Sequence, residues 1–478
     1  MRVNKGTPDQ PNVRCRLVAQ EIAYGGKDDE LYAGTPSLAV LKWLLSDLAT
    51  DKSPDARLMI MDIKSAFLYG EAERNVYIEL PHRDPQSGKQ LVGKLLKAMY
   101  GTRDAPKIWF KTVKKLMVKL GFRVSMVQPS LFTHDEKGLK LMVHVDEFLV
   151  TGGRDQCDWL YGELSKEFEM SCKILGGKVG EEAKYLNRVV KWGADGIYIS
   201  GDTKHAQILL KEWGMANCAP VDTPMGRDAE EYTNNEERSQ RPVMDDAEAR
   251  RYRRATARVN FMAQDRPDLS VVSRIMSQFM AQPRKGDEIL LKRVIRYLKK
   301  FPVVESRMLW QRRPDHMTVN IDSDWAGDRT SRKSTSGGTI RNGQHLIQHW
   351  SKLQSTIALS SGEAELNAAV KGTSEVIGFK EMLEDLRIDV KIKIETDASV
   401  CKTILLRHGC GKIKHLSTKQ LWVQGAIESY GIRVVKVPRL ANPADLLTHS
   451  CSREDHERHL RCLGQCKNTD CDDVSERG

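Results

Sequence analysis

Apolar and polar positions follow two different periodicities along this chain, and these divide it into regions. Over roughly the first 220 residues, short apolar runs of the kind that form strands alternate with segments whose apolar residues recur at helical spacing. This alternation is typical of an α/β or α+β domain. Residues 35–50 and 105–120 are predicted helices; in the second, Pro106 suits the first turn and Gly121 suits the C-terminal cap.

A second region begins after a polar segment. Residues 222–246 are rich in Arg, Glu, Asn and Asp and are predicted to form a linker. Three helices are then predicted, over residues 248–264, 269–281 and 287–300. Another α/β region follows over residues 319–447 and contains a long amphipathic helix at 361–386. Because 478 residues exceed what one core organises, we expect a multidomain protein of mixed α+β and α/β class.

Acidic residues lie within or next to apolar, strand-like runs, in two groups far apart in the sequence. The first group is Asp62, Asp146 and Glu147, and the second is Asp322, Glu365, Asp397 and Asp445. Buried carboxylates are costly unless they are neutralised, and a divalent cation is the usual partner of oxygen-only ligand sets. Two such groups in a basic chain predict two metal-dependent phosphoryl-transfer sites acting on nucleic acid. Strand capping or pairing with lysine is the alternative for the first group.

Positive charge is concentrated between the two acidic groups. The chain carries a net charge of +11, and residues 241–313 hold 18 Lys and Arg against 8 Asp and Glu. We interpret this stretch as a track that contacts phosphates, with a solvated surface as the alternative. On the helix predicted from residue 287, Lys292, Arg296 and Lys299 are spaced by four and three residues and share one face. That face is predicted to follow a nucleic-acid backbone.

No targeting or membrane segment is visible in the sequence. The N-terminus has no apolar signal region, and no run of about 18 apolar residues occurs. The ten cysteines are therefore expected to be reduced thiols in an intracellular protein. Four of them lie near the C-terminus, with His456 and His459 among them: Cys451, Cys462, Cys466 and Cys471. Their spacing matches no standard zinc pattern, so a short terminal helix with incidental thiols is favoured over a zinc site.

Three N-terminal motifs resemble those of reverse transcriptases from Ty1/copia-type retrotransposons. Residues 62–70, Asp-Ile-Lys-Ser-Ala-Phe-Leu-Tyr-Gly, resemble the first catalytic motif of that family. Residues 99–110, Met-Tyr-Gly-Thr-Arg-Asp-Ala-Pro-Lys-Ile-Trp-Phe, resemble its Leu-Tyr-Gly-Leu-Lys-Gln-Ala-Pro-Arg-Ala-Trp-Tyr motif, and residues 16–19 resemble its fingers strand. The resemblance extends from about residue 14 to about residue 464 and implies a palm-and-fingers domain.

The resemblance implies roles for individual residues. Asp62 and Asp146 are the expected metal ligands, and Phe67 is the expected steric gate against a ribonucleotide 2′-hydroxyl. Tyr100 and Gly101 are expected to line the site of the incoming nucleotide. The family's Tyr-Val-Asp-Asp motif reads His-Val-Asp-Glu at residues 144–147, so Glu147 keeps the charge but displaces it by one methylene. Because misplacement by ~1 Å costs ~100-fold in rate, a weakened polymerase is predicted.

Four further motifs, at residues 320–327, 358–366, 396–399 and 442–448, resemble the ribonuclease H domain of the same family. They imply that Asp322, Glu365, Asp397 and Asp445 hold the metals. Glu363 and Glu365 are two positions apart on a helix and diverge by about 200°, so only one can face a metal. Asp322 and Asp324 are two apart on a strand and point the same way, which makes Asp324 a candidate outer-shell residue. His415 is expected to be structural or to contact substrate.

These observations predict the C-terminal part of a copia-type Pol polyprotein, with two Mg²⁺ or Mn²⁺ ions per active site. The expected partners are an RNA template, a DNA primer, RNA–DNA hybrid, dNTPs and other parts of the polyprotein. The expected location is cytoplasmic, in a virus-like particle, or nuclear. The predicted parts are a reverse transcriptase with truncated fingers (1–225), a basic helical connection (226–315), a ribonuclease H-like domain (316–450) and a tail (451–478). Two alternatives are an active ribonuclease H with a decayed polymerase and a non-enzymatic nucleic-acid-binding remnant.

Overall fold

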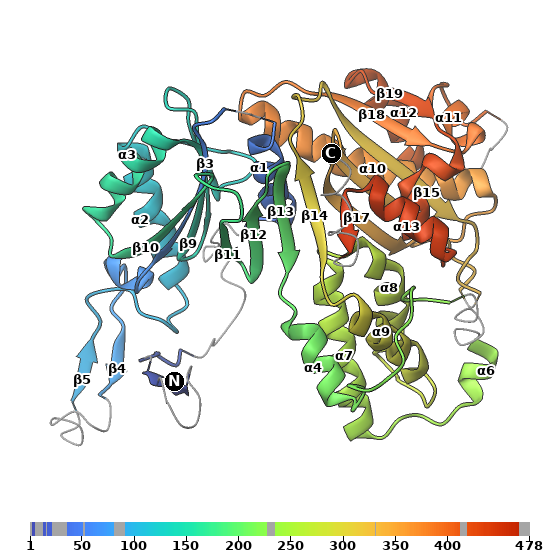
Figure 1. Cartoon of the computed structure of the whole chain (residues 1–478), viewed down its shortest axis with the longest axis horizontal. Helices are drawn as coiled ribbons and strands as arrows, with labels where there is room; N and C mark the ends of the chain where they lie inside the picture. Colours follow the sequence, from blue (N-terminus) through green and yellow to red (C-terminus); the bar gives the residue numbers. More distant parts are fainter. Residues whose placement is uncertain are drawn as a thin grey trace. The chain divides into compact units, whose positions relative to one another are not determined.

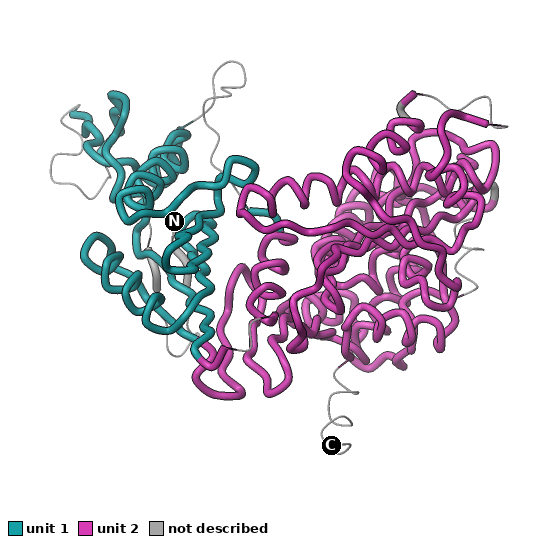
Figure 2. Tube along the Cα trace, turned by 90° about the horizontal axis from the view of Figure 1, so that it is seen from above, with its two compact units in different colours: residues 1–37, 55–174 teal, residues 38–54, 175–478 magenta. Residues whose placement is uncertain are grey.

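The chain forms two compact units in the computed structural model (Figure 2). Unit 1 comprises residues 1–37 and 55–174, and unit 2 comprises residues 38–54 and 175–478. The structure describes residues 2–4, 13–15, 17–21, 36–50, 53–80, 91–226, 235–329, 331–411 and 418–467. None of the helices in these ranges has the length and apolar character that a membrane crossing requires.

Unit 1 is built on a six-stranded sheet in the order β10-β3-β9-β8-β7-β6, of which β3, β9 and β10 are labelled in Figure 1. The strands are β3 (Ala56–Ile63), β6 (Arg123–Val124), β7 (Leu131–His134), β8 (Leu139–His144), β9 (Glu147–Gly153) and β10 (Met170–Leu175). Helices α2 (Ala105–Lys119) and α3 (Arg154–Ser165) share one apolar core with this sheet, in which Trp109 and Leu160 pack with Met61 and Phe148. Alternate residues of the strands therefore face the helices.

Smaller elements complete unit 1. The 3₁₀ helix η2 (Ala66–Tyr69) follows β3 directly, and β4 (Tyr77–Glu79) pairs with β5 (Val92–Lys94). Near the N-terminus, β1 (Arg2–Asn4) pairs with β2 (Val13–Cys15).

Unit 2 contains an antiparallel sheet in the order β11-β12-β13-β14-β20. The strands are β11 (Glu182–Tyr185), β12 (Arg188–Trp192), β13 (Gly196–Gly201), β14 (Val304–Leu309) and β20 (Gln465–Lys467). Between β13 and β14 lie the helices α4 (Lys204–Glu212), α6 (Asn235–Gln240), α7 (Asp246–Ala263), α8 (Ser270–Gln278) and α9 (Glu288–Lys300). Four of them, α4, α7, α8 and α9, share a core that includes Tyr252 and Tyr297.

The other sheet of unit 2 has the order β17-β16-β15-β18-β19. Strands β15 (His316–Asp324), β16 (Thr335–Asn342) and β17 (His345–Leu353) are antiparallel, whereas β18 (Lys391–Thr396) and β19 (Arg433–Lys436) run parallel to β15. Helix α10 (Ser361–Asp385) packs on β15 and β16. The remaining elements are η3 (Pro267–Leu269), which precedes α8, and α11 (Ser399–Leu405), α12 (Thr418–Ser429), η4 (Arg439–Ala441), η5 (Pro443–Leu447) and α13 (Arg453–Cys462).

The helices predicted from periodicity are present, and the two compact units differ in extent from the predicted parts, whose bounds stay a prediction. Helix α1 (Leu38–Leu48) belongs to unit 2, where Ser46 hydrogen-bonds Nδ1 of His345 at 2.8 Å and accepts from Asn342 at 2.9 Å. Residues 451–467 are also part of unit 2, because β20 pairs with β14. Both associations depend on pairings distant in sequence, which local patterns do not encode. The predicted linker at 222–246 contains α6, and residues 227–234 lie outside the described ranges.

Candidate active sites

Three of the predicted ribonuclease H carboxylates converge in unit 2. Asp322 lies on β15, Asp397 directly follows β18, and Glu365 lies in the second turn of α10. Strands β15 and β18 are parallel with Asn320 beside Glu395, so the same register brings Asp322 beside Asp397. Ligand oxygens of Asp322, Glu365 and Asp397 lie within 4.8 Å of one another. Oxygen-only donors at this spacing fit a hard divalent cation such as Mg²⁺ or Mn²⁺.

Burial and mutual repulsion strain this cluster when all its members are charged. Burial raises the pKa of Asp322 to about 6, and the charges of Asp445 and Asp397 add to the effect. Burial also raises the pKa of Glu365 to about 8, with further contributions from Asp322 and Asp397. Buried Oε2 of Glu365 has no hydrogen-bond partner. A cation among these oxygens would relieve the repulsion and would satisfy that atom.

Neighbouring groups hold two of these carboxylates in place. The hydroxyl of Thr448 donates to Oδ2 of Asp322 at 2.6 Å, and the Ser323 amide donates to Oε1 of Glu365 at 3.2 Å. Because both carboxylates accept such bonds, the orientation of the cluster is set by the fold itself.

Glu363 and Asp324 take different positions from their neighbours in sequence. Glu363 is buried and accepts from the Leu359 amide at 2.7 Å, at the start of α10. The N-cap residue Ser360 accepts from the Glu363 amide at 3.2 Å, so both the backbone and the side chain of Glu363 take part in capping the N-terminus of the helix. Asp324 accepts from the Thr335 amide, and burial raises its pKa to about 6. The structure therefore brings Glu365, and not Glu363, to the cluster.

Asp445 lies beside the cluster but faces different neighbours. It belongs to η5, which is tied to β15 by a hydrogen bond from Asn442 to the Ile321 carbonyl at 2.9 Å. Its Oδ1 accepts from Arg439 Nε at 3.1 Å, and its Oδ2 lies 3.6 Å from Nε2 of His449. Burial acts to raise the pKa of Asp445, but the contact with His459 and the charges of His449 and Arg439 outweigh it and lower the pKa.

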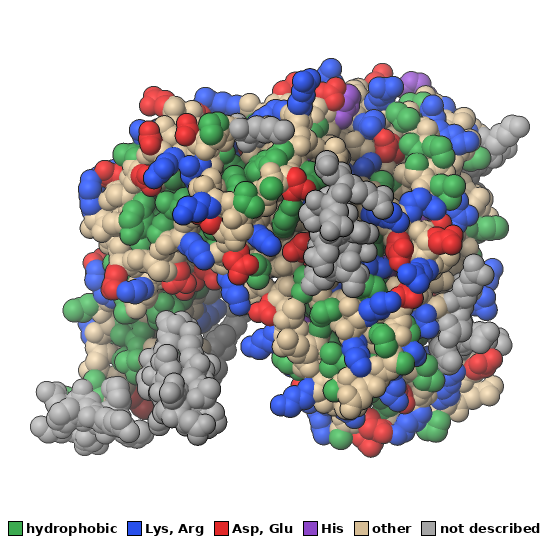
Figure 3. Space-filling view, in the orientation of Figure 1, with side chains coloured by type: hydrophobic (Ala, Val, Ile, Leu, Met, Phe, Trp, Pro, Cys, Tyr) green, Lys and Arg blue, Asp and Glu red, His purple; other side chains and the backbone are tan. Residues whose placement is uncertain are grey.

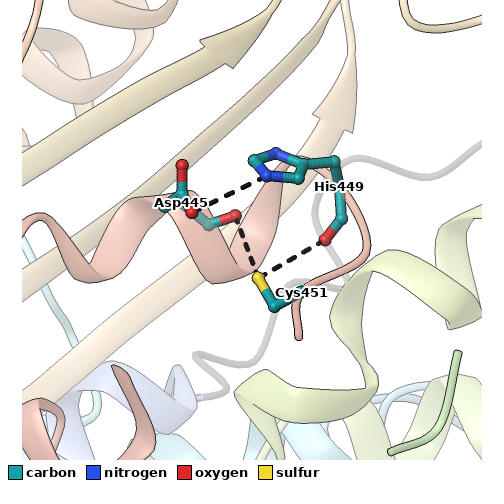
Figure 4. Close-up of side chains that lie close together, drawn as sticks. All are labelled: Asp445, His449 and Cys451. Carbon is teal, nitrogen blue, oxygen red and sulfur yellow. Dashed lines mark hydrogen bonds and ion pairs between the residues drawn. The ribbon is translucent and has the colours of Figure 1, made fainter. Parts of the chain in front are cut away.

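Asp445 forms a second group with His449 and Cys451, whose ligand atoms also lie within 4.8 Å of one another (Figure 4). Sequence reasoning missed His449, although it directly follows the quoted motif and lies four residues after Asp445. It also assigned Cys451 to a group of tail thiols. Among the described residues of that tail, Cys462 is exposed and His456 is buried against Tyr297. Cys471 of the tail lies outside the described ranges, and so does His415, which was expected to be structural or to contact substrate.

The predicted polymerase residues gather at one end of the hairpin formed by β8 and β9. Val145 and Asp146 form the two-residue turn, with Val145 at φ 54°, and Asp62 is paired in register with Glu147. The Ile63 amide donates to the Asp146 carbonyl at 2.8 Å. Directly opposed like charges destabilise a sheet, so the Asp62–Glu147 pair favours a cation. Asp62 is exposed at this end of the sheet.

Aromatic packing fixes the turn that carries Asp146. Buried Trp109 of α2 donates from Nε1 to the Val145 carbonyl at 2.6 Å. Its ring contacts those of Tyr69, Phe148 and Phe168, with centroids 5.2–6.4 Å apart. The Trp of the Ala-Pro-Lys-Ile-Trp motif therefore holds the Val145–Asp146 turn in place through this hydrogen bond.

The predicted nucleotide-site residues are neighbours in unit 1. The rings of Phe67 and Tyr100 lie 4.7 Å apart between centroids. Gly101 has φ 93°, and a Cβ there would come within 1.9 Å of the Ala19 carbonyl oxygen. The Ala19 amide donates to the Tyr100 carbonyl at 2.8 Å. Only glycine fits this close approach of two backbone segments.

Two residues of the predicted basic face, Arg296 and Lys299, form hydrogen bonds to backbone carbonyls within unit 2. Arg296 Nε donates to the Ala219 carbonyl and Lys299 Nζ to the Cys218 carbonyl, each at 2.7 Å. These bonds attach α9 to residues 218–219, whereas Lys292 is exposed. On the face of the molecule in Figure 3, Lys and Arg are interspersed with acidic side chains and form no continuous band. Contact of all three residues with phosphates stays a prediction.

Comparison with known proteins agrees with the motifs. Residues 6–227 match the family model described as reverse transcriptase (RNA-dependent DNA polymerase). The chain is 26% identical over 475 residues to a retrovirus-related Pol polyprotein from transposon TNT 1-94 of Nicotiana tabacum, covering 95% of this chain and 34% of that protein. It is 27% identical over 466 residues to the corresponding protein of transposon RE1 of Arabidopsis thaliana, covering 94% of this chain and 30% of that protein.

A solved structure supports the fold. A foamy viral protease-reverse transcriptase, determined in complex with dsDNA, aligns with a TM-score of 0.51 at 11% identity, over 92% of this chain and 77% of that one. The chain spans about a third of the length of the curated relatives. Its fold is that of a reverse transcriptase joined to a ribonuclease H-like domain; residues 6–227 belong to the reverse transcriptase family, and the chain is similar to Ty1/copia-type retrotransposon Pol polyproteins over nearly its whole length.

Proposed function

We propose that this chain hydrolyses the RNA strand of RNA–DNA hybrids with divalent cations held by Asp322, Glu365, Asp397 and Asp445. The observation that supports this most strongly is the convergence of Asp322, Glu365 and Asp397, with ligand oxygens within 4.8 Å of one another. Their burial keeps the pKa values of Asp322 and Glu365 high, so the site stores repulsion that metal binding releases. Membership of the family supports nucleic acid as the substrate class.

Different residues of the chain have different roles in the proposed hydrolysis. Bound cations would activate the attacking water and stabilise the leaving 3′-oxygen. Thr448 and the Ser323 amide keep Asp322 and Glu365 aimed at the cluster through the hydrogen bonds described above. Arg439 holds Oδ1 of Asp445, which keeps this carboxylate near the cluster. The 2′-hydroxyl of the substrate allows RNA to be distinguished from DNA.

A cleavage assay tests the proposal. The purified chain is incubated with an RNA–DNA hybrid labelled in the RNA strand, in Mg²⁺ or Mn²⁺. We expect RNA cleavage, no cleavage of duplex DNA, and loss of activity in Asp322→Asn without unfolding. Cleavage that persists in Asp322→Asn, or that needs no divalent cation, would contradict the assignment.

We propose further that unit 1 extends a DNA primer on an RNA template. The proposal rests on the gathering of Asp62, Asp146 and Glu147 at the β8–β9 turn. Phe67 beside Tyr100 is suited to reject a ribonucleotide by contact with its 2′-hydroxyl. We expect weak, metal-dependent primer extension that Asp62→Asn abolishes. Absence of extension with either Glu or Asp at position 147 would favour a decayed polymerase domain that only binds the hybrid.

A further inference from the structure

We propose a second metal site of a different chemical class, in which Asp445, His449, Cys451 and His459 bind a zinc-class transition-metal ion. These residues supply one carboxylate, two imidazoles and one thiol, a donor set that favours zinc over magnesium. Asp445, His449 and Cys451 have ligand atoms within 4.8 Å of one another. All four residues line one pocket of about 360 Å³.

The distances around Asp445 suit such an ion. In a tetrahedral zinc site with bonds of about 2.0–2.3 Å, neighbouring ligand atoms lie about 3.3–3.8 Å apart. Oδ2 of Asp445 lies 3.6 Å from Nε2 of His449 and 3.6 Å from Nε2 of His459. Sγ of Cys451 lies 4.0 Å from the backbone carbonyl oxygen of Asp445 and 3.9 Å from that of His449 (Figure 4). The thiol is therefore close to both of the other proposed ligands.

Hydrogen bonding presents His449 as a ligand. The Thr448 hydroxyl donates its proton to Oδ2 of Asp322 at 2.6 Å, so the contact between that hydroxyl and Nδ1 of His449 at 2.9 Å needs the imidazole as donor. In the neutral ring, which is the form that binds a metal, this leaves the lone pair of Nε2 beside Oδ2 of Asp445, so both atoms are oriented as ligands. A hydrogen bond at the second ring nitrogen is also the usual support of a metal-bound histidine.

His459 is a further indication of a ligand. Its side chain is almost entirely buried, at 1% exposure, and its Nδ1 has no hydrogen-bond partner. Burying an imidazole in this way is costly unless its Nε2, which faces Asp445, gains a strong partner. Arg439 is the competing partner, since its Nη2 lies 3.4 Å from Nε2 of His449. An ion-pair network around Arg439 is therefore the outcome that metal binding must be tested against.

Zinc binding is measured on the full chain in excess Mg²⁺, so that the Asp322 cluster does not take up zinc. We expect one equivalent of zinc per chain, and with Co²⁺ as probe a near-ultraviolet thiolate-to-metal charge-transfer band. Cys451→Ser and His449→Ala should lose both signals while keeping the wild-type circular dichroism. Cys462→Ser, which alters an exposed thiol outside this group, is the matched control and should keep both.

Three results would overturn the site. They are no zinc binding by the wild-type chain, an unchanged stoichiometry and affinity in both Cys451→Ser and His449→Ala, or loss of zinc in Glu365→Gln but not in Cys451→Ser. The last result would place the ion among the hard carboxylates. None of these measurements depends on catalysis, so their outcome tests the zinc site independently of the proposed hydrolase activity.

Asp445 belongs both to the proposed zinc site and to the proposed hydrolase site, so zinc binding should affect hydrolysis. This expectation rests on the proposed function. A carboxylate drawn toward zinc cannot serve the Asp322 cluster equally, so zinc should inhibit Mg²⁺-dependent hydrolysis of the hybrid. The zinc concentration that halves the rate should rise at least about tenfold in Cys451→Ser relative to Cys462→Ser. An unchanged inhibitory concentration would reject this coupling, whereas absence of any hydrolysis would reject the proposed function and leave the binding result intact.

Discussion

Asp322 and Asp62 both lie near the end of a strand in an acidic group, but their surroundings differ. Asp322 is 7% exposed, accepts a hydrogen bond from Thr448, and shares its cluster with Glu365 and Asp397. Asp62 is exposed and is paired with Glu147 beside the turn of the β8–β9 hairpin. The first group is held in place by the protein, whereas the second, if it is the proposed polymerase site, would be organised further by bound metal, primer and nucleotide. Catalytic rates depend on such preorganisation.

The comparison predicts its largest effect at Glu365. Glu365→Gln should lower the rate of hybrid cleavage by at least about 100-fold, as removal of one preorganised charge-stabilising group does elsewhere. Above about pH 8, where Glu365 is ionised, the same change should also raise the melting temperature of the metal-free protein, because it removes a buried, repelling charge. Cleavage rates and thermal unfolding measure the two effects.

Glu363→Gln is the matched control, since Glu363 is buried at the start of the same helix but accepts from the Leu359 amide. It should change the cleavage rate by no more than a few fold. Equal losses of activity at positions 363 and 365 would reject the orientation of α10 on which the site is built.

On the polymerase side, the expected effect is a gain. Glu147→Asp withdraws the carboxylate by one methylene from its place opposite Asp62. Because ~1 Å of misplacement costs ~100-fold, the rate of primer extension should rise by up to about 100-fold. Single-turnover extension on an RNA template measures it. A lower rate in the Asp variant would mean that this site has adapted to Glu147.

The buried cluster should also make the stability of the metal-free protein depend on pH. The folded-state pKa values of Asp322 and Glu365, about 6 and about 8, lie above their ordinary values of 3.8 and 4.5. The native cluster therefore keeps protons that the unfolded chain releases, so its contribution to stability falls as pH rises from about 4 to about 8. Denaturant unfolding of wild type minus Glu365→Gln isolates this effect.

Magnesium should flatten that pH dependence, because a bound cation stabilises the ionised carboxylates. A pH dependence that is identical in wild type and Glu365→Gln would contradict the strained cluster.

The sequence predicted candidate residues for both sites, and those assignments stay predictions, but it did not predict their neighbours. Periodicity and motif order located β15, α10 and β18, and strand geometry then required Asp322 and Asp397 to meet. The pairing of β20 with β14 and the place of α1 in unit 2 depend on distant contacts, which no local pattern encodes. His449 was missed for a related reason, since its significance comes from facing Asp445 rather than from a recognisable motif.

The basic face of α9 shows the same limit. Helical spacing correctly placed Lys292, Arg296 and Lys299 on one face, because positions three and four apart are neighbours on a helix. It could not reveal that the carbonyls of Cys218 and Ala219 lie against two of them. Their cations are therefore already bonded, and Lys292 is the member that stays exposed.

The smallest predicted effect concerns the affinity of α9 for an RNA–DNA hybrid. Lys292→Ala should reduce the steepness of the log–log dependence of hybrid binding on salt by about 0.9, the value for one phosphate contact on B-DNA. Lys299→Ala should instead lower the melting temperature, because it removes the bond to the Cys218 carbonyl. Fluorescence anisotropy across a salt series and thermal unfolding separate the two roles. If Lys292→Ala leaves the slope unchanged while Lys299→Ala reduces it, the bonded lysine is the phosphate contact and the exposed one is not.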